Sequence, residues 1–392
     1  MKTQWLDDPQ AMRHAGPELL SLALMDSRNL LLQRLAQDES RAALRLAVHA
    51  GWYQERWIAR HVQRQRGEAC DASVPQLSGI EPRVDAWLAQ AQPDDTAAAS
   101  PALDASTVRA YLAETLDITL ELLAGTPATD APLHYYRQSL LHEDRLAETL
   151  AERLRAGAPP SRGECEPIWL PGQRWQLGTP AGQGGLVPHN ERWAHEVAVP
   201  EFEIDAQAVN WARFVEFAHD GGYDRAELWS SAGWAWVQSQ GRRAPQGVEQ
   251  LRGAVLVQRG PASGGAMRRA PGAQPVMHVS RFEAEAWCRW AGRRLPTEPE
   301  WELAAAQGAG RGFVWGDVFE WVAGSARAWP GAGVAAPGAL DAVPAPDSPG
   351  GPWGVLRGAS FATRSRWRHA KARRFVPLAL DSAFCGFRSC AL

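Results

Sequence analysis

The sequence predicts two domains of different class, a helical domain followed by an α+β domain. The length of 392 residues fits two domains, because a domain commonly has about 100–200 residues. Glycine and proline interrupt regular structure, and only 13 of the 64 in this chain precede residue 151. The boundary is expected in the stretch 156–167, whose Pro-Pro pair and glycine end a helix. The two domains therefore cover residues 1–157 and 158–392.

The first domain is expected to be a four-helix bundle. Apolar residues recur at helical spacing in 17–36, 41–62, 106–124 and 133–155. Pro17 suits the first turn of its helix, and Ser106 is expected to cap the third helix. A long polar connection over 64–104 separates the second helix from the third, which predicts an up-and-down bundle with one crossover.

The second domain is expected to contain short strands and few helices. Strand-like runs span 195–204 and 354–361, and helical pieces span 210–222 and 281–292. Thr297 can cap a further helix beginning at Glu298. The Gly-, Pro- and Ala-rich stretches 259–275 and 330–352 are typical of irregular loops, and Trp287, Trp290 and Trp301 are expected to pack together. This pattern predicts an α+β domain rather than a βαβ array.

Composition excludes several classes of function. A formal net charge of −3 argues against a nucleic-acid-binding surface, which is basic. The sequence contains no run of about 18 apolar residues, so we expect no membrane partner. The polar start does not resemble a signal peptide, and an odd number of five cysteines argues against a disulfide framework. A cytoplasmic protein is expected.

Two histidines in the first domain are candidate metal ligands. His49 lies on the second predicted helix and His142 on the fourth, with acidic residues nearby. Imidazoles on facing helices of a bundle are how such folds assemble metal sites. Surface histidines or hydrogen-bonded core histidines would produce the same pattern.

Motifs in both halves resemble one family of fused proteins. The run 276–306 is followed by WGDVFEW (315–321), VLRGASFATR (355–364) and CGFRSC (385–390). These segments resemble the domain shared by formylglycine-generating enzymes and the oxygen-dependent sulfoxide synthases of ergothioneine biosynthesis. In the first half, LAVHAGWYQERW and HEDRLAE (142–148) resemble the two iron-histidine helices of those synthases. The resemblance implies a DinB-like, iron-binding bundle fused to a formylglycine-generating-enzyme-like (C-type-lectin-like) α+β domain.

Further segments resemble the selenoneine synthase branch, namely LLSLALMDSRN (19–29), GIEPRVDAW (79–87) and the ending GFRSCAL. This resemblance implies an oxidoreductase with Fe(II) as cofactor and O₂ as cosubstrate. Such an enzyme joins selenium from a selenosugar to the imidazole of hercynine, the trimethylammonium betaine of histidine. Two alternatives stay open: an ergothioneine-type C–S sulfoxide synthase that uses a thiol, and a catalytically inactive paralogue that binds hercynine.

The chain departs from the family pattern at three places. Leu146 occupies the position of the second motif histidine, so Glu148 is the best remaining third ligand beside His49 and His142. Glu148 lies about 120° around the helix from His142, so it needs a bent helix or a long rotamer to reach the same metal. No tyrosine follows Tyr223, although the sulfoxide synthases are understood to use a tyrosine of their second domain as a proton and electron donor.

The third departure concerns the copper-binding cysteines of the formylglycine-generating enzymes. Thr363 and Arg368 stand at those two positions. Sulfatase activation is therefore disfavoured.

Aromatic residues of the second domain are candidates for substrate binding. A trimethylammonium group donates no conventional hydrogen bond, so an aromatic face is its natural receptor. Core packing is the alternative for each of them. Arg83, on the bundle connection, is a candidate for the sugar or thiol cosubstrate by resemblance, and a solvated surface arginine is the alternative. The remaining candidates are Trp229, Trp236, Phe375 and Phe384, with Asp381 as counter-charge.

Overall fold

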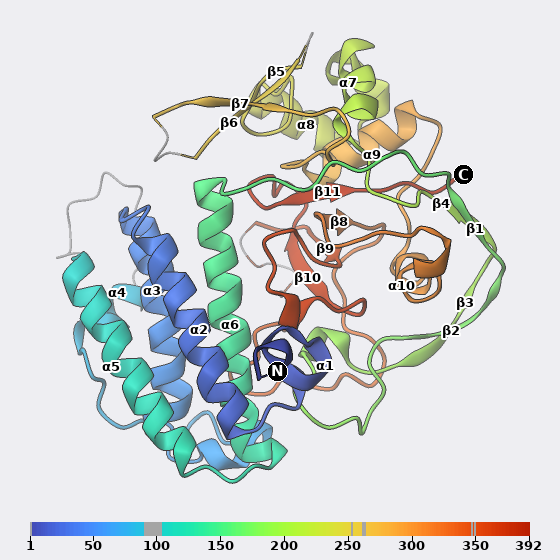
Figure 1. Cartoon of the computed structure of the whole chain (residues 1–392). Coiled ribbons are helices and arrows are strands. Elements are labelled where there is room, and N and C mark those ends of the chain that lie inside the picture. Colours follow the sequence, from blue (N-terminus) through green and yellow to red (C-terminus); the bar gives the residue numbers. More distant parts are fainter. Residues whose placement is uncertain (1, 90–103, 252–253, 261–263, 346–347, 349) are drawn as a thin grey trace.

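Two regions of different architecture lie side by side in the computed structural model, which describes residues 2–89, 104–251, 254–260, 264–345, 348 and 350–392. Residues up to 155 form the helical part, drawn in blue to green in Figure 1. Residues from 168 onward form the C-terminal part, which combines short strands with short helices. The expected sequence of a helical region and a mixed α+β region is confirmed, whereas the DinB-like assignment stays a prediction.

The helical part is dominated by α2 (Pro17–Leu35), α3 (Arg41–Gln54), α5 (Ala105–Ala124) and α6 (Asp130–Leu154). The short helices α1 (Pro9–Arg13) and α4 (Arg83–Ala89) accompany them. α6 packs against both α2 and α3, and α3 also packs against α5. α6 lies on the side of the helical part that faces the C-terminal part (Figure 1). Within the described residues, no helix is long and apolar enough to cross a membrane.

The beginning of α5 corrects the prediction for Ser106. Asp104 is the cap, and its carboxylate accepts a hydrogen bond of 2.7 Å from the backbone N–H of Thr107. Ser106 lies inside the first turn and donates its hydroxyl to Asp104. A carboxylate is a stronger hydrogen-bond acceptor than a serine hydroxyl, and its negative charge is attracted to the positive end of the helix dipole. Of the predicted connection 64–104, residues 90–103 lie outside the described residues.

The second helix is α-helical over a shorter span than the predicted 41–62. After Gln54 the chain continues in a five-residue π-helical turn, Glu55–Ala59. Glu55 is almost completely buried there and accepts hydrogen bonds from the hydroxyl of Tyr111 and the backbone N–H of Ile80. Such π turns are frequent near functional sites, and this one follows His49 within two helical turns.

The C-terminal part contains four small sheets within its described residues. The central sheet has the order β10 (Arg373–Pro377), β9 (Trp353–Arg357), β8 (Phe319–Trp321), β11 (Cys385–Phe387), and only its β8–β11 pair is parallel. Antiparallel pairs join β1 (Ile168–Leu170) to β4 (Phe202–Ile204) and β2 (Gln173–Leu177) to β3 (His195–Val199). The strands β5 (Val248–Gln250), β6 (Val255–Gln258) and β7 (Met267–Ala270) form the fourth sheet. The helices are α7 (Trp211–His219), α8 (Ser231–Gln240), α9 (Arg281–Trp290) and α10 (Glu298–Gln307).

Local expectations for this part are confirmed in some places and wrong in others. Thr297 caps α10, and Glu300 completes a reciprocal capping box with it. The stretch 259–275 is not wholly irregular, because it contains β7. Trp287 and Trp290 pack together, but Trp301 packs against Trp315 elsewhere. The buried indole N–H of Trp301 needs an acceptor and finds the carboxylate of Glu320 at 2.8 Å.

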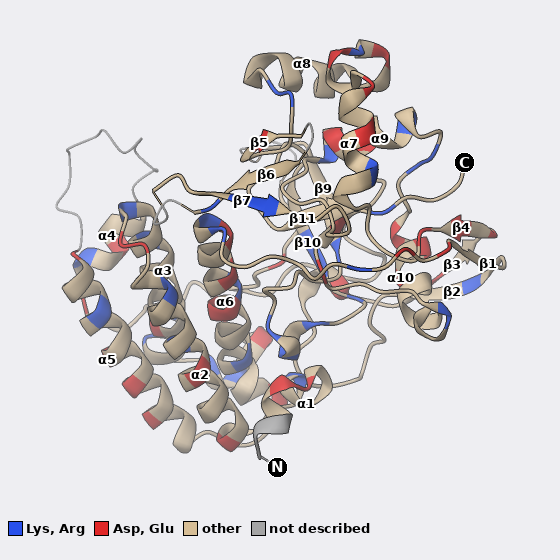
Figure 2. Ribbon diagram, turned by 45° about the horizontal axis from the view of Figure 1, so that its top comes forward, with Lys and Arg blue, Asp and Glu red and all other residues tan. Residues whose placement is uncertain are grey.

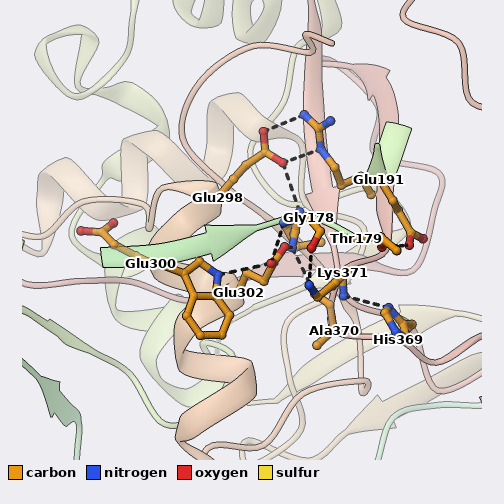
Figure 3. Close-up of polar contacts among 12 residues, drawn as sticks. Gly178, Thr179, Glu191, Glu298, Glu300, Glu302, His369, Ala370 and Lys371 are labelled. Carbon is orange, nitrogen blue, oxygen red and sulfur yellow. Dashed lines mark hydrogen bonds and ion pairs between the residues drawn. The ribbon is translucent and has the colours of Figure 1, made fainter. Parts of the chain in front are cut away.

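Buried ion pairs tie α10 to the central sheet (Figure 3). Glu298 accepts two hydrogen bonds from Arg373, at 2.6 and 2.8 Å, and one from Arg357. Glu302 binds Arg357 and also accepts the backbone N–H of Gly178. Both guanidinium groups are fully buried. Because unpaired buried charges are costly, these pairs fix the positions of β9 and β10 relative to α10.

A second set of buried polar contacts joins the two parts of the chain. Arg366, which is fully buried, binds Asp144 of α6 through two nitrogens at 2.6 and 2.9 Å. The same guanidinium reaches Asp26 of α2 at 2.7 Å. Figure 2 shows both acidic and basic positions along α6. α6 therefore has one side in the helical part and one side against the C-terminal part.

Candidate functional site

His49 and His142 lie together on facing helices. His49 extends from α3 and His142 from α6, and the Nδ1 atom of His49 is 2.8 Å from the Nε2 atom of His142. One of these nitrogens donates to the other, which requires that at least one ring be neutral at the shared position. The sequence predicted two imidazoles on facing helices, and the structure places both rings in contact.

The environment of the pair favours neutral imidazoles. Burial lowers the pKa of His49, and the charge of Arg45 lowers it further. Burial also places the pKa of His142 well below its usual value, with added contributions from His49 and Arg145. Metals bind the neutral form of imidazole. Burial therefore favours the neutral form of both rings, which is the form that binds metals.

Aromatic side chains surround the two histidines. The ring centroid of Tyr53 is 4.7 Å from that of His142, and the ring of Trp52 is 5.3 Å from that of His49. The hydroxyl of Tyr53 lies 2.6 Å from the side-chain oxygen of Gln138 and 2.7 Å from the backbone carbonyl of Gly338. Tyr53 thus connects the histidine pair to a loop of the C-terminal part.

The same loop has a second contact with α6 close to His142. Arg145, three residues further along α6, binds Asp341 at 2.6 Å. Gly338 has φ = +74° and sits against Trp57, where a Cβ atom would come within 2.6 Å of the indole. The loop 337–341 is therefore fitted to the helical part beside the pair. The sequence analysis predicted neither the contact of this loop with the helical part nor the part that Tyr53 takes in it, although Tyr53 lies on the same helix face as His49.

Glu148 lies apart from the histidine pair. It follows His142 by six residues, which is about 9 Å along the helix axis. Its Oε1 atom accepts hydrogen bonds from the hydroxyls of Ser360 and Thr363, the second at 2.6 Å. The structure therefore brings His49 and His142 together but directs Glu148 toward the C-terminal part.

Leu146 lies one turn after His142 and packs against the apolar core between α2, α3 and α5. No group of three or more histidine, cysteine or acidic side chains suited to a metal is found in the part of the chain that the structure describes. The donor set thus fits two positions of a metal ion, while the third protein ligand of a two-histidine-one-carboxylate iron site is not in place.

The predicted substrate residues do not form one pocket. Arg83 is exposed and pairs with Glu81, two residues away. Trp229 is buried in the core, where its indole N–H donates to the carbonyl of Gly222. Phe384 is also buried and contacts Phe361, whereas Phe375 of β10 is partly buried beneath Arg373.

Trp236 and Asp381 do come together, but around an arginine. The guanidinium carbon of Arg242 lies 5.6 Å from the ring centroid of Trp236, and Arg242 also binds the carboxylate of Asp381. An aromatic face and a carboxylate are the groups expected to receive a trimethylammonium cation. Here both already interact with a cation of the protein itself.

Comparison with known proteins places these features in a family. Residues 158–329 match the model of the sulfatase-modifying factor enzyme 1-like domain. The chain is 32% identical over 296 residues to a hercynine oxygenase of Mycolicibacterium smegmatis, an alignment that covers 69% of this chain and 63% of that protein. It is 30% identical to a hercynine oxygenase of Mycolicibacterium thermoresistibile, with 76% of this chain and 69% of that protein aligned.

A formylglycine-generating enzyme of Streptomyces coelicolor is similar over a shorter region. The two are 38% identical over 170 residues, which are 38% of this chain and 50% of that enzyme. The matches to the hercynine oxygenases are longer and cover most of both chains. The chain therefore belongs to the hercynine oxygenase family.

Proposed function

We propose that this chain is an oxygen-dependent oxidoreductase that joins the selenium of a selenosugar to the imidazole of hercynine. Its membership in the hercynine oxygenase family supports an oxidoreductase that acts on this small molecule. The observation that carries the proposal in the structure is the direct contact of His49 with His142. The proposal treats residues 1–157 as the iron-binding domain and residues 158–392 as the domain that completes the site, in a cytoplasmic protein.

His49 and His142 are the residues that would hold Fe(II). When bound, iron supplies the activation of O₂ that the reaction requires. The protein contributes two neutral imidazoles, whose orientation is fixed by the packing of α3 against α6. Glu148 can join them only if it leaves Ser360 and Thr363, so its place as a ligand belongs to the proposal.

The overall balance of the reaction identifies what must be measured. Joining an imidazole C–H to a selenol Se–H gives a C–Se bond and removes two hydrogens, which O₂ accepts as H₂O₂. In the C–S alternative, O₂ supplies one oxygen atom to the sulfoxide and the other leaves as water. The two reactions therefore differ in peroxide yield as well as in product mass.

Turnover with defined substrates tests this function. Hercynine is offered in air with the selenosugar, with its sulfur analogue or with γ-glutamylcysteine, and products are identified by mass. We expect the selenoether from the selenosugar, together with one H₂O₂ per product. A sulfoxide formed faster from a thiol would establish the C–S alternative instead.

An inactive hercynine-binding paralogue is the second candidate, because Leu146 fills a ligand position and Glu148 is bound elsewhere. Metal analysis of protein purified without oxygen distinguishes the two. One iron per chain excludes the inactive paralogue, whereas hercynine binding without iron or turnover supports it.

A further inference from the structure

Arg56 lies close to the histidine pair, on the π-helical turn that continues α3. It follows His49 by about two helical turns, so both residues are on the same side of the helix. The guanidinium carbon of Arg56 is 5.4 Å from the ring centroid of Trp52, and the Trp52 ring is in turn 5.3 Å from that of His49. The indole of Trp52 therefore contacts both the guanidinium and the imidazole. The sequence analysis did not single out Arg56.

Two indole rings hold the guanidinium of Arg56. Besides its contact with Trp52, its guanidinium carbon lies 5.6 Å from the ring centroid of Trp57. Trp57 is buried and stacks on Tyr135, with ring centroids 5.1 Å apart, so its position is fixed by packing. A guanidinium that stacks on aromatic faces keeps its N–H donors free, because they point outward in the plane of the group. The rings therefore orient Arg56 without using its hydrogen-bond donors.

The side chain of Arg56 has no ion pair and no hydrogen bond within the described residues. Asp85 of α4 is close enough to sense its charge, but both oxygens of Asp85 are taken. One accepts the indole N–H of Trp52 at 2.7 Å, and the other binds Arg60 at 2.8 Å. The nearby carboxylate of Glu55 is buried against α5. Arg56 is thus an oriented cation whose donors are available to an added anion.

A small molecule can reach this arginine and the histidine pair together. His49, Trp52 and Arg56 are each only partly buried, so all three are accessible from solvent. α4, which carries Asp85, packs beside α3 (Figure 1). The proposed reaction requires the imidazole of hercynine at the histidine pair. The carboxylate of hercynine is joined to that imidazole by a short chain of carbons, which suits a receptor one indole ring away.

We propose that Arg56 binds the carboxylate of hercynine and so selects this substrate for the site at His49 and His142. The inference rests on the proposed function, because it takes hercynine as the ligand. A guanidinium and a carboxylate match through two parallel N–H···O hydrogen bonds. The thiol cosubstrate of the C–S alternative can also carry carboxylates, but the reacting imidazole is the group that must lie beside the histidine pair. Selection by Arg56 applies to C–Se formation, to C–S formation and to an inactive hercynine-binding paralogue.

Titration calorimetry on the full chain tests the proposal. It is done without oxygen, first without and then with Fe(II), so that no turnover consumes the ligand. The probes are hercynine and its decarboxylated analogue, in which a hydrogen replaces the carboxylate. Arg56→Gln should weaken hercynine binding at least tenfold, because charge-assisted hydrogen bonds are lost. The same substitution should leave binding of the analogue unchanged.

Two comparisons control this experiment. Arg41→Gln removes an arginine from the first turn of the same helix and should bind both ligands as the parent does. The parent itself should bind hercynine at least tenfold more tightly than the analogue. This second comparison needs no substitution, so it tests the proposal even if Arg56→Gln does not fold.

Equal affinity of the parent for hercynine and the analogue would overturn the proposal, as would equal hercynine affinity in Arg56→Gln and the parent. γ-Glutamylcysteine is titrated into the same proteins. A loss confined to that thiol would assign Arg56 to the cosubstrate and would also contradict the proposal.

Failure of the inference is distinguishable from failure of the proposed function. Hercynine that binds through Arg56 but is not converted would contradict the oxidoreductase and support the inference. Turnover with an unchanged KM for hercynine in Arg56→Gln would do the reverse. A parent protein that does not bind hercynine at all would overturn both.

Discussion

At the residue scale, the contact between His49 and His142 is the feature on which the proposed metal site depends. His49→Ala and His142→Ala should each remove iron, measured by elemental analysis after anaerobic loading, because neither remaining imidazole can hold the ion alone. The helical circular dichroism signal should persist, since both side chains are only partly buried. Full iron occupancy in the double variant would show that the metal lies elsewhere.

Leu146 allows a gain-of-function test. It lies four residues after His142, so a histidine there would share its face one turn along the helix. Leu146→His should tighten iron binding at least tenfold in a competition titration with a chelator, because a third imidazole is added. Leu146→Gln is the control for loss of apolar packing. Equal iron affinity in all three proteins would contradict the assigned site.

Whether Glu148 binds the metal can be tested with and without the Leu146→His substitution. If Glu148 leaves Ser360 and Thr363 to bind the metal, Glu148→Gln should lower iron affinity in the parent but much less in the Leu146→His background. If it remains between the two hydroxyls, the substitution should leave iron affinity unchanged in both backgrounds. The same titration measures both outcomes.

At the element scale, the start of α5 depends on its cap. Asp104→Ala removes the acceptor for the Thr107 N–H and should destabilise the protein by about 1 kcal/mol, measured by urea unfolding. Ser106→Ala removes a hydroxyl that only donates to Asp104, so its effect should be smaller. A larger loss for Ser106→Ala would restore the original assignment of the cap.

The loop 337–341 is a second element with a specific contact. Gly338→Ala introduces a Cβ atom against Trp57 at a positive φ, so the loop should leave the helical part. Hydrogen exchange of residues 336–341 should accelerate more than tenfold, while exchange in α2 stays unchanged. Unaltered exchange in the loop would show that the side chain of Trp57 moves aside and the loop keeps its position.

At the scale of the whole molecule, the lowered pKa values of buried histidines predict that the folded protein loses stability in acid. Burial lowers the pKa of His278 from 6.5 to about 4, so the unfolded chain binds a proton below pH 6.5 that the folded chain does not accept until about pH 4. Stability should fall as pH decreases through this window, by about 3 kcal/mol from this residue. His134 and His369 act in the same direction.

The variant His278→Asn removes this proton and keeps a residue that tolerates the φ of +61° found there. Its unfolding free energy should depend less on pH between 4 and 6.5 than that of the parent. Parallel pH profiles for the two proteins would show that His278 does not contribute.

The sequence alone determined the division into a helical and a mixed region, the helix-forming segments and the family resemblance. Each of these depends on local signals: helical spacing of leucines in 17–36 and 133–155, the Pro-Pro break after α6, and the Thr297 cap. That His49 and His142 lie on facing helices was also predicted, from their places in two amphipathic segments of the expected bundle.

The tertiary structure alone decided which partners the charged side chains took. Glu148 binds Ser360 and Thr363, and Arg242 occupies the aromatic face and carboxylate that Trp236 and Asp381 offer. In several of these pairs, such as Glu148 with Ser360, the two residues are more than 100 positions apart in the sequence. No local pattern specifies them, because a buried charge takes whichever opposite group the packing of distant segments brings within reach.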